Sequence, residues 1–216
     1  MTTIVYPSLE AAADGLVTRI RAAMDAAASG GAPLIVALDG RCAAGKTTLA
    51  AAVARRLREG ALRVQVVHLD DFFLRPEQRT EERLATPGEN IDHERFLAEI
   101  LLPLSKNQPA VYRAYDCSVQ ALGEPIALPA ADVVLAEGSY SCHRALWDYY
   151  GLRWFVDVAP AVQQRRILTR NGERMLRRFV EEWIPKEEAY HAAQMLRTRC
   201  DAVICIEEHT RKREEA

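Results

Sequence analysis

The stretch from Gly40 to Thr47 has the residue types and the spacing of a phosphate-binding loop. Its sequence, GRCAAGKT, fits the pattern G-x-x-x-x-G-K-T. In loops of this pattern the backbone N–H groups converge on phosphate oxygens, the lysine reaches the outer phosphates and the hydroxyl binds Mg²⁺. We therefore expect Lys46 to be catalytic and Thr47 to bind the metal. The residues expected to contact the nucleotide are Gly40, Arg41, Cys42, Ala43, Ala44, Gly45, Lys46, Thr47 and Thr48.

Two adjacent carboxylates, Asp70 and Asp71, follow the apolar run 63–69 (RVQVVHL), which is typical of a buried strand. In an open parallel sheet, ligands bind beyond the carboxyl ends of the strands. Asp70 is therefore a candidate general base, which would accept the proton of a substrate hydroxyl as its oxygen attacks a γ-phosphoryl group. One of the two aspartates is expected to cap the following turn instead. Position favours Asp70 for the chemistry, and Asp71 stays as the alternative.

Glu137 follows a second predicted buried strand, 132–136 (DVVLA). A carboxylate at this point beside a phosphate loop typically holds Mg²⁺, directly or through water. We expect Glu137 to share a metal ion with Thr47. The alternative is a carboxylate at a strand end that pairs with an arginine.

Arginines are concentrated in the predicted helical region 162–199. Phosphoryl transfer spreads negative charge over the transferred oxygens, so a mobile arginine segment that closes over them would stabilise that charge and exclude water. Arg166, Arg170 and Arg174 are spaced to share one helical face. We expect Arg166 and Arg170 to be catalytic, Arg174 to bind the nucleotide, and the lid to cover approximately residues 165–184, with the other arginines solvated.

A second group of polar residues is a candidate site for the phosphate acceptor. The alternating pattern of 109–128 predicts a hairpin turning at Gly123, Glu124 and Pro125. The hairpin carries Arg113, Tyr115 and Asp116. Their side chains could stack on a ring-bearing acceptor and form hydrogen bonds with it, or they could form ordinary cross-strand pairs. Asp92 precedes a predicted helix and is either its N-cap or a partner of a substrate hydroxyl, whereas His93 is expected to bind no metal. The expected acceptor-binding residues are Asp92, Arg113, Tyr115 and Asp116.

The elements that must position these groups follow from the apolar periodicity. Buried strands are predicted at 34–38, 63–69, 132–136, 152–158 and 201–206, and amphipathic helices lie between them, the first capped by Ser8. Alternating strands and helices favour an α/β fold with a mostly parallel sheet. We expect one domain over residues 1–216, a three-layer α/β/α P-loop NTPase fold with an arginine-rich helical lid and a charged tail at 207–216.

Composition excludes several classes of protein. The formal charge of −2 lacks the basic excess of a nucleic-acid-binding surface, and no apolar run is long enough to span a membrane. Five scattered cysteines without a C-x-x-C pair indicate neither a disulfide framework nor a zinc site. We expect a cytoplasmic protein with no nucleic-acid or membrane partner, and a homo-oligomer is left open.

Taken together, the motifs resemble those of the uridine kinase family, which belongs to a wider group with phosphoribulokinase and bacterial pantothenate kinase. The resemblance rests on GRCAAGKT, the strand end DDFF, the NIDHERF segment, YRAYDC, a strand ending in EG and the arginine-rich segment. It implies that Asp70 is the base and Glu137 the Mg²⁺-side carboxylate, and it implies lid roles for Arg166 and Arg170. It also implies acceptor contacts for Asp92, Tyr115 and Asp116. The chain departs from the family pattern at Ala43, Ala44 and Asn171.

The sequence therefore predicts an ATP- and Mg²⁺-dependent kinase that phosphorylates a hydroxyl of a small molecule, with a nucleoside such as uridine or cytidine as the favoured acceptor. One alternative is a kinase for another hydroxyl metabolite, pantothenate-like or sugar-like. A second alternative is a P-loop accessory ATPase that acts on a partner protein.

Overall fold

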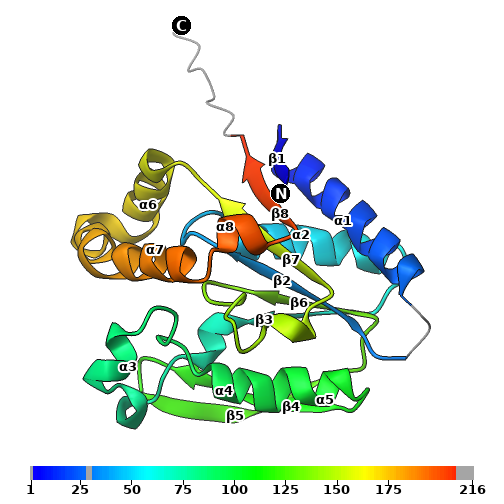
Figure 1. Ribbon diagram of the computed structural model, residues 1–216, viewed down its shortest axis with the longest axis horizontal. Helices are drawn as coiled ribbons and strands as arrows, with labels where there is room; N and C mark the ends of the chain where they lie inside the picture. Colours follow the sequence, from blue (N-terminus) through cyan, green and yellow to red (C-terminus); the bar gives the residue numbers. More distant parts are fainter. Residues whose placement is uncertain (1, 28–30, 208–216) are drawn as a thin grey trace, which may run out of the picture.

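A six-stranded parallel sheet forms the centre of the computed structural model, which describes residues 2–27 and 31–207. The strand order is β1-β8-β7-β2-β6-β3, and every neighbouring pair is parallel, so the predicted α/β fold with a mostly parallel sheet is confirmed (Figure 1). The strands are β1 Thr2–Tyr6, β2 Leu34–Gly40, β3 Val64–His68, β6 Val133–Glu137, β7 Leu152–Asp157 and β8 Ala202–Ile206.

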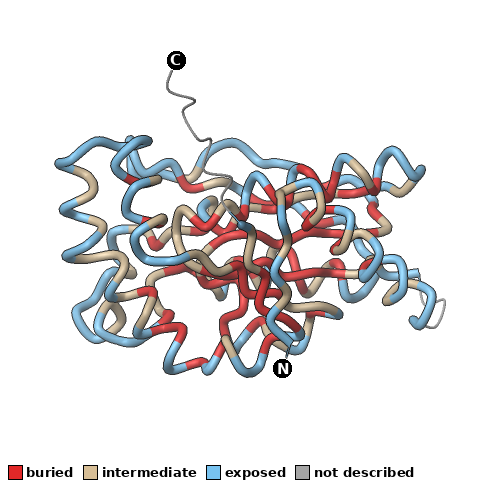
Figure 2. The backbone as a smooth tube through the Cα atoms, turned by 90° about the horizontal axis from the view of Figure 1, so that it is seen from above, coloured by how far each residue is buried: buried red, intermediate tan, exposed pale blue. Residues whose placement is uncertain are grey.

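Helices cover both faces of this sheet, and the central strands are buried for that reason. On β2, Val36 and Leu38 face a core shared with α1 (Leu9–Ala26) and α2 (Lys46–Glu59), whereas Ile35 and Ala37 face a second core on the opposite side. Figure 2 shows the buried backbone concentrated in the middle of the molecule. The apolar run at 34–38 therefore reads as continuous rather than alternating, because both of its faces are covered.

The second core also receives a helical region and a separate hairpin. The helical region is α4 (His93–Phe96), a π-helical turn η3 (Leu97–Leu101) and α5 (Leu102–Ser105), and the antiparallel hairpin is β4 (Ala110–Asp116) with β5 (Ala121–Leu128). The remaining elements are η1 Leu69–Phe72, η2 Pro76–Gln78, α3 Glu81–Ala85, η4 Trp147–Tyr149, α6 Pro160–Arg178, η5 Phe179–Trp183, α7 Ile184–Ala193 and α8 Leu196–Arg199.

The structure corrects the sequence analysis at the edge of the sheet and in the hairpin. Strand β1 was missed; it is a short edge strand with largely exposed residues, and its pairing with β8 supplies the order that its own pattern does not encode. The hairpin turns at residues 117–120 rather than at 123–125, which lie inside β5. A register irregularity between Arg113 and Tyr115 offsets the two strands, so the glycine and proline fall within a strand.

The prediction that Arg166, Arg170 and Arg174 share one helical face is also wrong. Gly172 inside α6 has φ +77° and ψ 172°, which no helix can accommodate, and the axis changes direction there. Arg174 lies beyond this kink, so it does not continue the face that carries Arg166 and Arg170. Over residues 2–27 and 31–207, no helix is long and apolar enough to cross a membrane.

Candidate active site

The loop between β2 and α2 is held in a conformation that depends on close backbone packing. Gly40 has φ +136°, and a Cβ there would lie only 2.0 Å from the carbonyl oxygen of Val156. Gly45 has φ +95° immediately before α2. Ala43 adopts the left-handed region with φ +57°. An alanine in that region carries about 1 kcal/mol of strain, which the surrounding loop must offset.

Lys46 is buried and its ammonium group is folded onto this loop. The group donates hydrogen bonds to the carbonyl oxygens of Gly40 (2.8 Å) and Arg41 (2.9 Å) and to Oγ of Ser139 (3.3 Å). Three partners use its three hydrogens. The lysine is therefore in place at the loop, and it would exchange one of these bonds to reach a phosphate oxygen.

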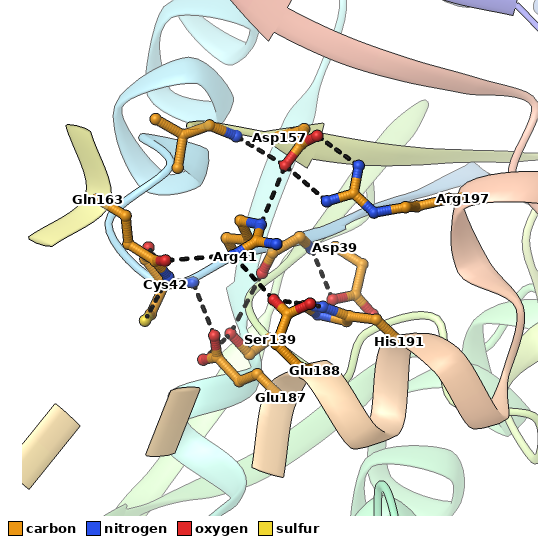
Figure 3. Close-up of polar contacts among 12 residues, drawn as sticks. Asp39, Arg41, Cys42, Ser139, Asp157, Gln163, Glu187, Glu188, His191 and Arg197 are labelled. Atoms are coloured by element: carbon orange, nitrogen blue, oxygen red, sulfur yellow. Dashed lines mark hydrogen bonds and ion pairs between the residues drawn. The ribbon is translucent and has the colours of Figure 1, made fainter. Parts of the chain in front are cut away.

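A carboxylate from a distant helix lies against the beginning of the loop. Glu187 on α7 accepts a hydrogen bond from the backbone N–H of Cys42 (2.9 Å) and another from Oγ of Ser139 (2.8 Å), as Figure 3 shows. Burial and this carboxylate raise the pKa of the Cys42 thiol to about 12. The N–H of Cys42 therefore already binds a carboxylate oxygen. This shows that the loop can bind an anionic oxygen, as it would have to do to hold the phosphates of a nucleotide.

The same strand that begins the loop carries a buried carboxylate that sequence analysis did not single out. Asp39 accepts hydrogen bonds from the N–H groups of Gly40 (2.6 Å), Tyr140 (3.3 Å) and Cys142 (2.7 Å) and from the hydroxyl of Tyr190 (2.7 Å). Burial raises its pKa, and these bonds oppose the shift. Asp39 thereby joins the phosphate loop, the segment after β6 and α7. The sequence offered one signal, a charged residue at the end of an apolar strand.

Thr47 and Glu137 lie together, as the proposed metal site requires. The Thr47 hydroxyl donates to Oε1 of Glu137 at 3.0 Å, and Nδ1 of His68 contacts the same oxygen. Glu137 is buried, and its contact with His68 raises the pKa of that histidine. A hydroxyl and a carboxylate side by side are oxygen donors of the kind Mg²⁺ prefers, so these residues fit the ion.

The two aspartates after β3 have different environments. The surrounding protein raises the pKa of Asp70, Lys46 opposes the shift and Glu137 adds to it, so Asp70 lies within the electrostatic influence of the loop lysine and the metal-side carboxylate. Asp71 accepts a hydrogen bond from the hydroxyl of Tyr112 on β4 (3.2 Å). Asp70 therefore responds to the charges of Lys46 and Glu137, whereas Asp71 is bonded to the hairpin, and this difference favours Asp70 as the base.

Of the predicted acceptor residues, Asp92 is the one with an unused buried acceptor atom. Its N–H donates to the carbonyl oxygen of Phe72 (2.8 Å), which ties it to the turn after Asp70 and Asp71. Its Oδ1 accepts from the N–H of Arg95 (3.1 Å) as an N-cap, and its buried Oδ2 has no hydrogen-bond partner within residues 2–27 and 31–207. Both predicted roles therefore remain compatible with the structure. Asp92 caps α4 through Oδ1, and its Oδ2 is available to accept a hydrogen bond from a substrate hydroxyl.

The three hairpin residues lie in different surroundings. Tyr115 is buried, and its hydroxyl accepts a hydrogen bond from Nη2 of Arg79 (3.0 Å), whose guanidinium also lies over the ring. Asp116 is exposed, and its Oδ1 accepts from the N–H (2.7 Å) and Oγ (2.6 Å) of Ser118, which closes the hairpin turn. Arg113 is exposed on β4. The structure thus gives Asp116 a structural role in the turn.

Among the arginines, the structure brings Arg166 to the loop. Its Nη1 donates to the carbonyl oxygen of Ala43 at 3.0 Å, and partial burial lowers its pKa. Arg170 is exposed and donates to Oδ1 of Asn171 (2.8 Å), and Arg174 is exposed beyond the kink. Arg41, which the sequence analysis expected to contact the nucleotide, pairs instead with Asp157 (3.2 Å) and Glu188 (2.9 Å) and joins the loop to β7 and α7.

Comparison with known proteins places the fold but gives no family for the chain. No protein-family model and no curated protein sequence matches it. A possible uridine kinase from Bacillus stearothermophilus has a similar structure, with a TM-score of 0.62 and 20% identity over 88% of this chain and 99% of that one. A candidate fructose transport system kinase from Silicibacter sp. has a TM-score of 0.67 and 22% identity, covering 87% and 98%. A D-glycerate 3-kinase from Cryptococcus neoformans has a TM-score of 0.61 and 17% identity, covering 82% and 87%. The chain therefore shares its α/β fold with these kinase structures.

Proposed function

We propose that the protein is an ATP- and Mg²⁺-dependent kinase that transfers the γ-phosphoryl group to a hydroxyl of a small molecule. The observation that carries this proposal is the 3.0 Å hydrogen bond from Thr47 beside Lys46 to Glu137 at the end of β6, on the sheet edge where Asp70 follows β3. A carboxylate, a loop lysine and a pair of metal donors at one edge of the sheet are the groups that phosphoryl transfer uses. The fold shared with structures described as kinases supports the same reading.

In this proposal the loop residues bind and neutralise the triphosphate. The N–H of Cys42, which now bonds Glu187, would bond a phosphate oxygen, and Lys46 would bond the outer phosphates. Arg166 donates to the loop from α6 and adds positive charge there. Thr47 and Glu137 would hold Mg²⁺, which when bound neutralises charge on the phosphate oxygens. Glu187 leaves the loop as the phosphates enter, because like charges repel at that distance.

Asp70 acts as the base. Its carboxylate accepts the proton of the acceptor hydroxyl as that oxygen forms a bond to phosphorus and the bond to the leaving nucleotide oxygen breaks. The raised pKa makes Asp70 a stronger base than an ordinary aspartate. The Asp71 carboxylate is held away from this task by Tyr112.

The acceptor is proposed to bind between Asp92 and the hairpin, with Oδ2 of Asp92 accepting a hydrogen bond from one of its hydroxyls. A nucleoside is the acceptor that the sequence resemblance favours. A sugar-like or sugar-acid acceptor is the second candidate, because Tyr115 is buried and engaged by Arg79 rather than presenting a free ring for stacking on a base. The similarity to structures described as fructose transport and glycerate kinases is in accord with this candidate.

The test is ADP release measured with purified protein, ATP or GTP, and a panel of nucleosides, sugars, glycerate and pantothenate. A phosphorylated product from one class of acceptor would support the proposal and identify that class. Nucleotide hydrolysis that needs a protein partner and gives no phosphorylated small molecule would instead make the chain an accessory ATPase. Failure of every acceptor with both nucleotides would overturn the kinase proposal.

A further inference from the structure

Two histidines and a glutamate meet outside the residues assigned to phosphoryl transfer. They are Glu89 and His93 near the start of α4 and His143 in the segment after β6. Nε2 of His93 lies 3.0 Å from one carboxylate oxygen of Glu89, and Nε2 of His143 lies 3.5 Å from the other. Within residues 2–27 and 31–207 no other group of three His, Cys, Asp or Glu side chains converges in this way. Sequence analysis expected His93 to bind no metal because it recognised no partner at metal-ligand spacing; Glu89 lies four residues earlier, and His143 is distant in the chain.

His143 provides a second and independent observation. It is 1% exposed, and its Nε2 has no hydrogen-bond partner within the described part of the chain. A buried polar atom without a partner lacks the compensation that normally offsets its removal from water, so it requires an explanation. This atom faces the Glu89 carboxylate, and a cation between them would satisfy both. Burial and the nearby His93 lower the pKa of His143 to about 4, which leaves its ring uncharged at neutral pH.

We propose that Glu89, His93 and His143 form a binding site for a Zn²⁺-like transition-metal ion. Two imidazole nitrogens and one carboxylate oxygen favour such an ion over Mg²⁺ or Ca²⁺, which prefer all-oxygen sets. With ligand bonds of about 2.1 Å, the donors around a tetrahedral ion lie about 3.4 Å apart. The two histidine nitrogens lie 3.0 and 3.5 Å from the two different oxygens of Glu89, and one ligand atom of each residue lies within 4.8 Å of the others. A small closure of the three side chains would bring them to the separation that the ion needs.

The surroundings supply what a metal site needs beyond its ligands. Nδ1 of His93 lies 3.6 Å from Oε2 of Glu94, a carboxylate of the kind that orients ligating histidines. Two cations lie nearby: Arg83 pairs with Glu94 at 2.7 Å and lies 3.8 Å from Glu89, and Arg144 acts electrostatically on His143.

Binding requires two local adjustments. The rings of His93 and His143 are stacked, with centroids 4.2 Å apart and planes 14° apart, and a metal lies in the plane of each imidazole that binds it. The rings must therefore tilt apart, and His93, which is the more exposed of the two, has room to move. Coordination through Nε2 also moves the His143 proton to Nδ1, which ends the 3.3 Å hydrogen bond from the Ala145 N–H.

The ion would link two parts of the candidate active site. Glu89 and His93 flank Asp92, whose Oδ2 is proposed to bind the acceptor, and His143 follows the segment that carries Glu137 and Ser139. A metal across this gap would fix the acceptor side to the phosphate side. The metal site itself does not depend on the kinase proposal, because metal binding is measured without turnover.

The experiment uses the full chain stripped of metal with a chelator and titrated with Zn²⁺ against a chromophoric indicator. We expect one ion per chain at this site, and a loss of affinity of about a hundredfold or more in His93→Gln and in Glu89→Gln, since each removes one of three ligands. Glu137→Gln and His191→Gln are matched controls that should bind Zn²⁺ as the parent does. Circular dichroism verifies that each variant is folded.

A second measurement identifies the ligands directly. Co²⁺ bound by nitrogen and oxygen donors gives visible absorption without the intense near-ultraviolet band of a cobalt–thiolate bond. We expect the visible bands in the parent and their loss in His93→Gln. A thiolate band would place the ion at a cysteine, for example at the buried pair Cys142 and Cys200, whose sulfur atoms are 4.0 Å apart, and would overturn the proposal. Absence of Zn²⁺ binding, or equal binding by His93→Gln, Glu89→Gln and the parent, would overturn it as well.

Discussion

The hydroxyl of Tyr190 on α7 donates a 2.7 Å hydrogen bond to Oδ2 of Asp39 at the end of β2, and both side chains are fully buried. The two residues are separated by 151 positions. This bond fixes the helix that carries Glu187 and Glu188 to the strand that leads into the phosphate loop. The geometry of the loop therefore depends on a helix far away in the sequence.

Replacement of Tyr190 by phenylalanine should lower the free energy of unfolding by about 1–3 kcal/mol, because it leaves one oxygen of the buried Asp39 without this donor. Urea denaturation followed by circular dichroism measures the change. Tyr150→Phe is the matched control, since the buried Tyr150 hydroxyl has no hydrogen-bond partner in the described chain. Its removal should leave stability unchanged or slightly raised. Equal losses in both variants would contradict this account.

Asp70→Asn should lower kcat by about 10²- to 10⁴-fold, which is the range for loss of a general base, while the Kd for ATP changes little. The measurement is steady-state kinetics with the acceptor found in the panel, together with calorimetric ATP titration. Asp71→Asn is the control and should retain most of the activity, because Asp71 is engaged by Tyr112. A larger loss in Asp71→Asn than in Asp70→Asn would reverse the assignment of the base.

Gly40→Ala should destabilise the protein by more than about 3 kcal/mol, because the new Cβ would lie 2.0 Å from the Val156 carbonyl oxygen at a φ of +136°. Thermal and urea unfolding measure this loss. Gly123→Ala provides the comparison, since its Cβ would lie 3.4 Å from the nearest atom and its φ is not in the left-handed region. That variant should stay within about 1 kcal/mol of the parent. A stable Gly40→Ala protein would contradict this prediction and would show that β2 and β7 can move apart to accommodate a Cβ at this position.

The stability of the protein should fall in mild acid because His191 is buried in its neutral form. Burial lowers its pKa to about 3, with the nearby cations Lys46, Arg41 and Arg197 adding to the shift. Between about pH 3 and 6.5 the unfolded chain therefore binds the proton that the folded chain excludes. The stabilisation is complete above pH 6.5 and is lost as the pH falls, by about 2 kcal/mol at pH 5.

Urea unfolding from pH 7 to 4.5 measures this dependence. His191→Gln should make the curve less steep and leave the contribution of His143, whose pKa burial also lowers. His68→Gln should not have this effect, because the pKa of His68 is raised by Glu137 and its contribution has the opposite sign. An unaltered acid dependence in His191→Gln would mean that other groups cause it.

Glu187→Gln should raise the affinity for ATP by about tenfold. The Glu187 carboxylate occupies the N–H of Cys42, so incoming phosphates must displace a charged acceptor and approach a like charge. Isothermal titration calorimetry of the nucleotide measures the change. Glu173→Gln, an exposed position on α6, removes the same charge away from the loop and should have no such effect. Weaker ATP binding in Glu187→Gln would instead make Glu187 a residue that positions the nucleotide.

The sequence alone determined the features whose physical cause is local. The pattern GRCAAGKT predicts the loop because its glycines and the following helix are contiguous, and Gly40 and Gly45 do adopt positive φ values. Apolar runs ending in Asp70 and Glu137 predict carboxylates at one edge of a parallel sheet, since parallel strands direct their ends the same way. Ser8 as the cap of α1 was predicted in the same local way and is confirmed.

Tertiary structure decided the rest, because the contacts concerned join residues that no short pattern relates. Packing of α7 on the loop brings Glu187 to Cys42, and the turn at Gly172 separates Arg174 from Arg166 although helical spacing aligned them. The side chain of Asp116 closes a turn whose position depends on a register irregularity in the hairpin. His143 faces Glu89 and His93 only because the segment after β6 folds against the start of α4. Local hydrogen bonding and apolar periodicity depend on residues that are close in the sequence, and a short pattern predicts them. These long-range contacts depend on how the helices and the sheet pack together.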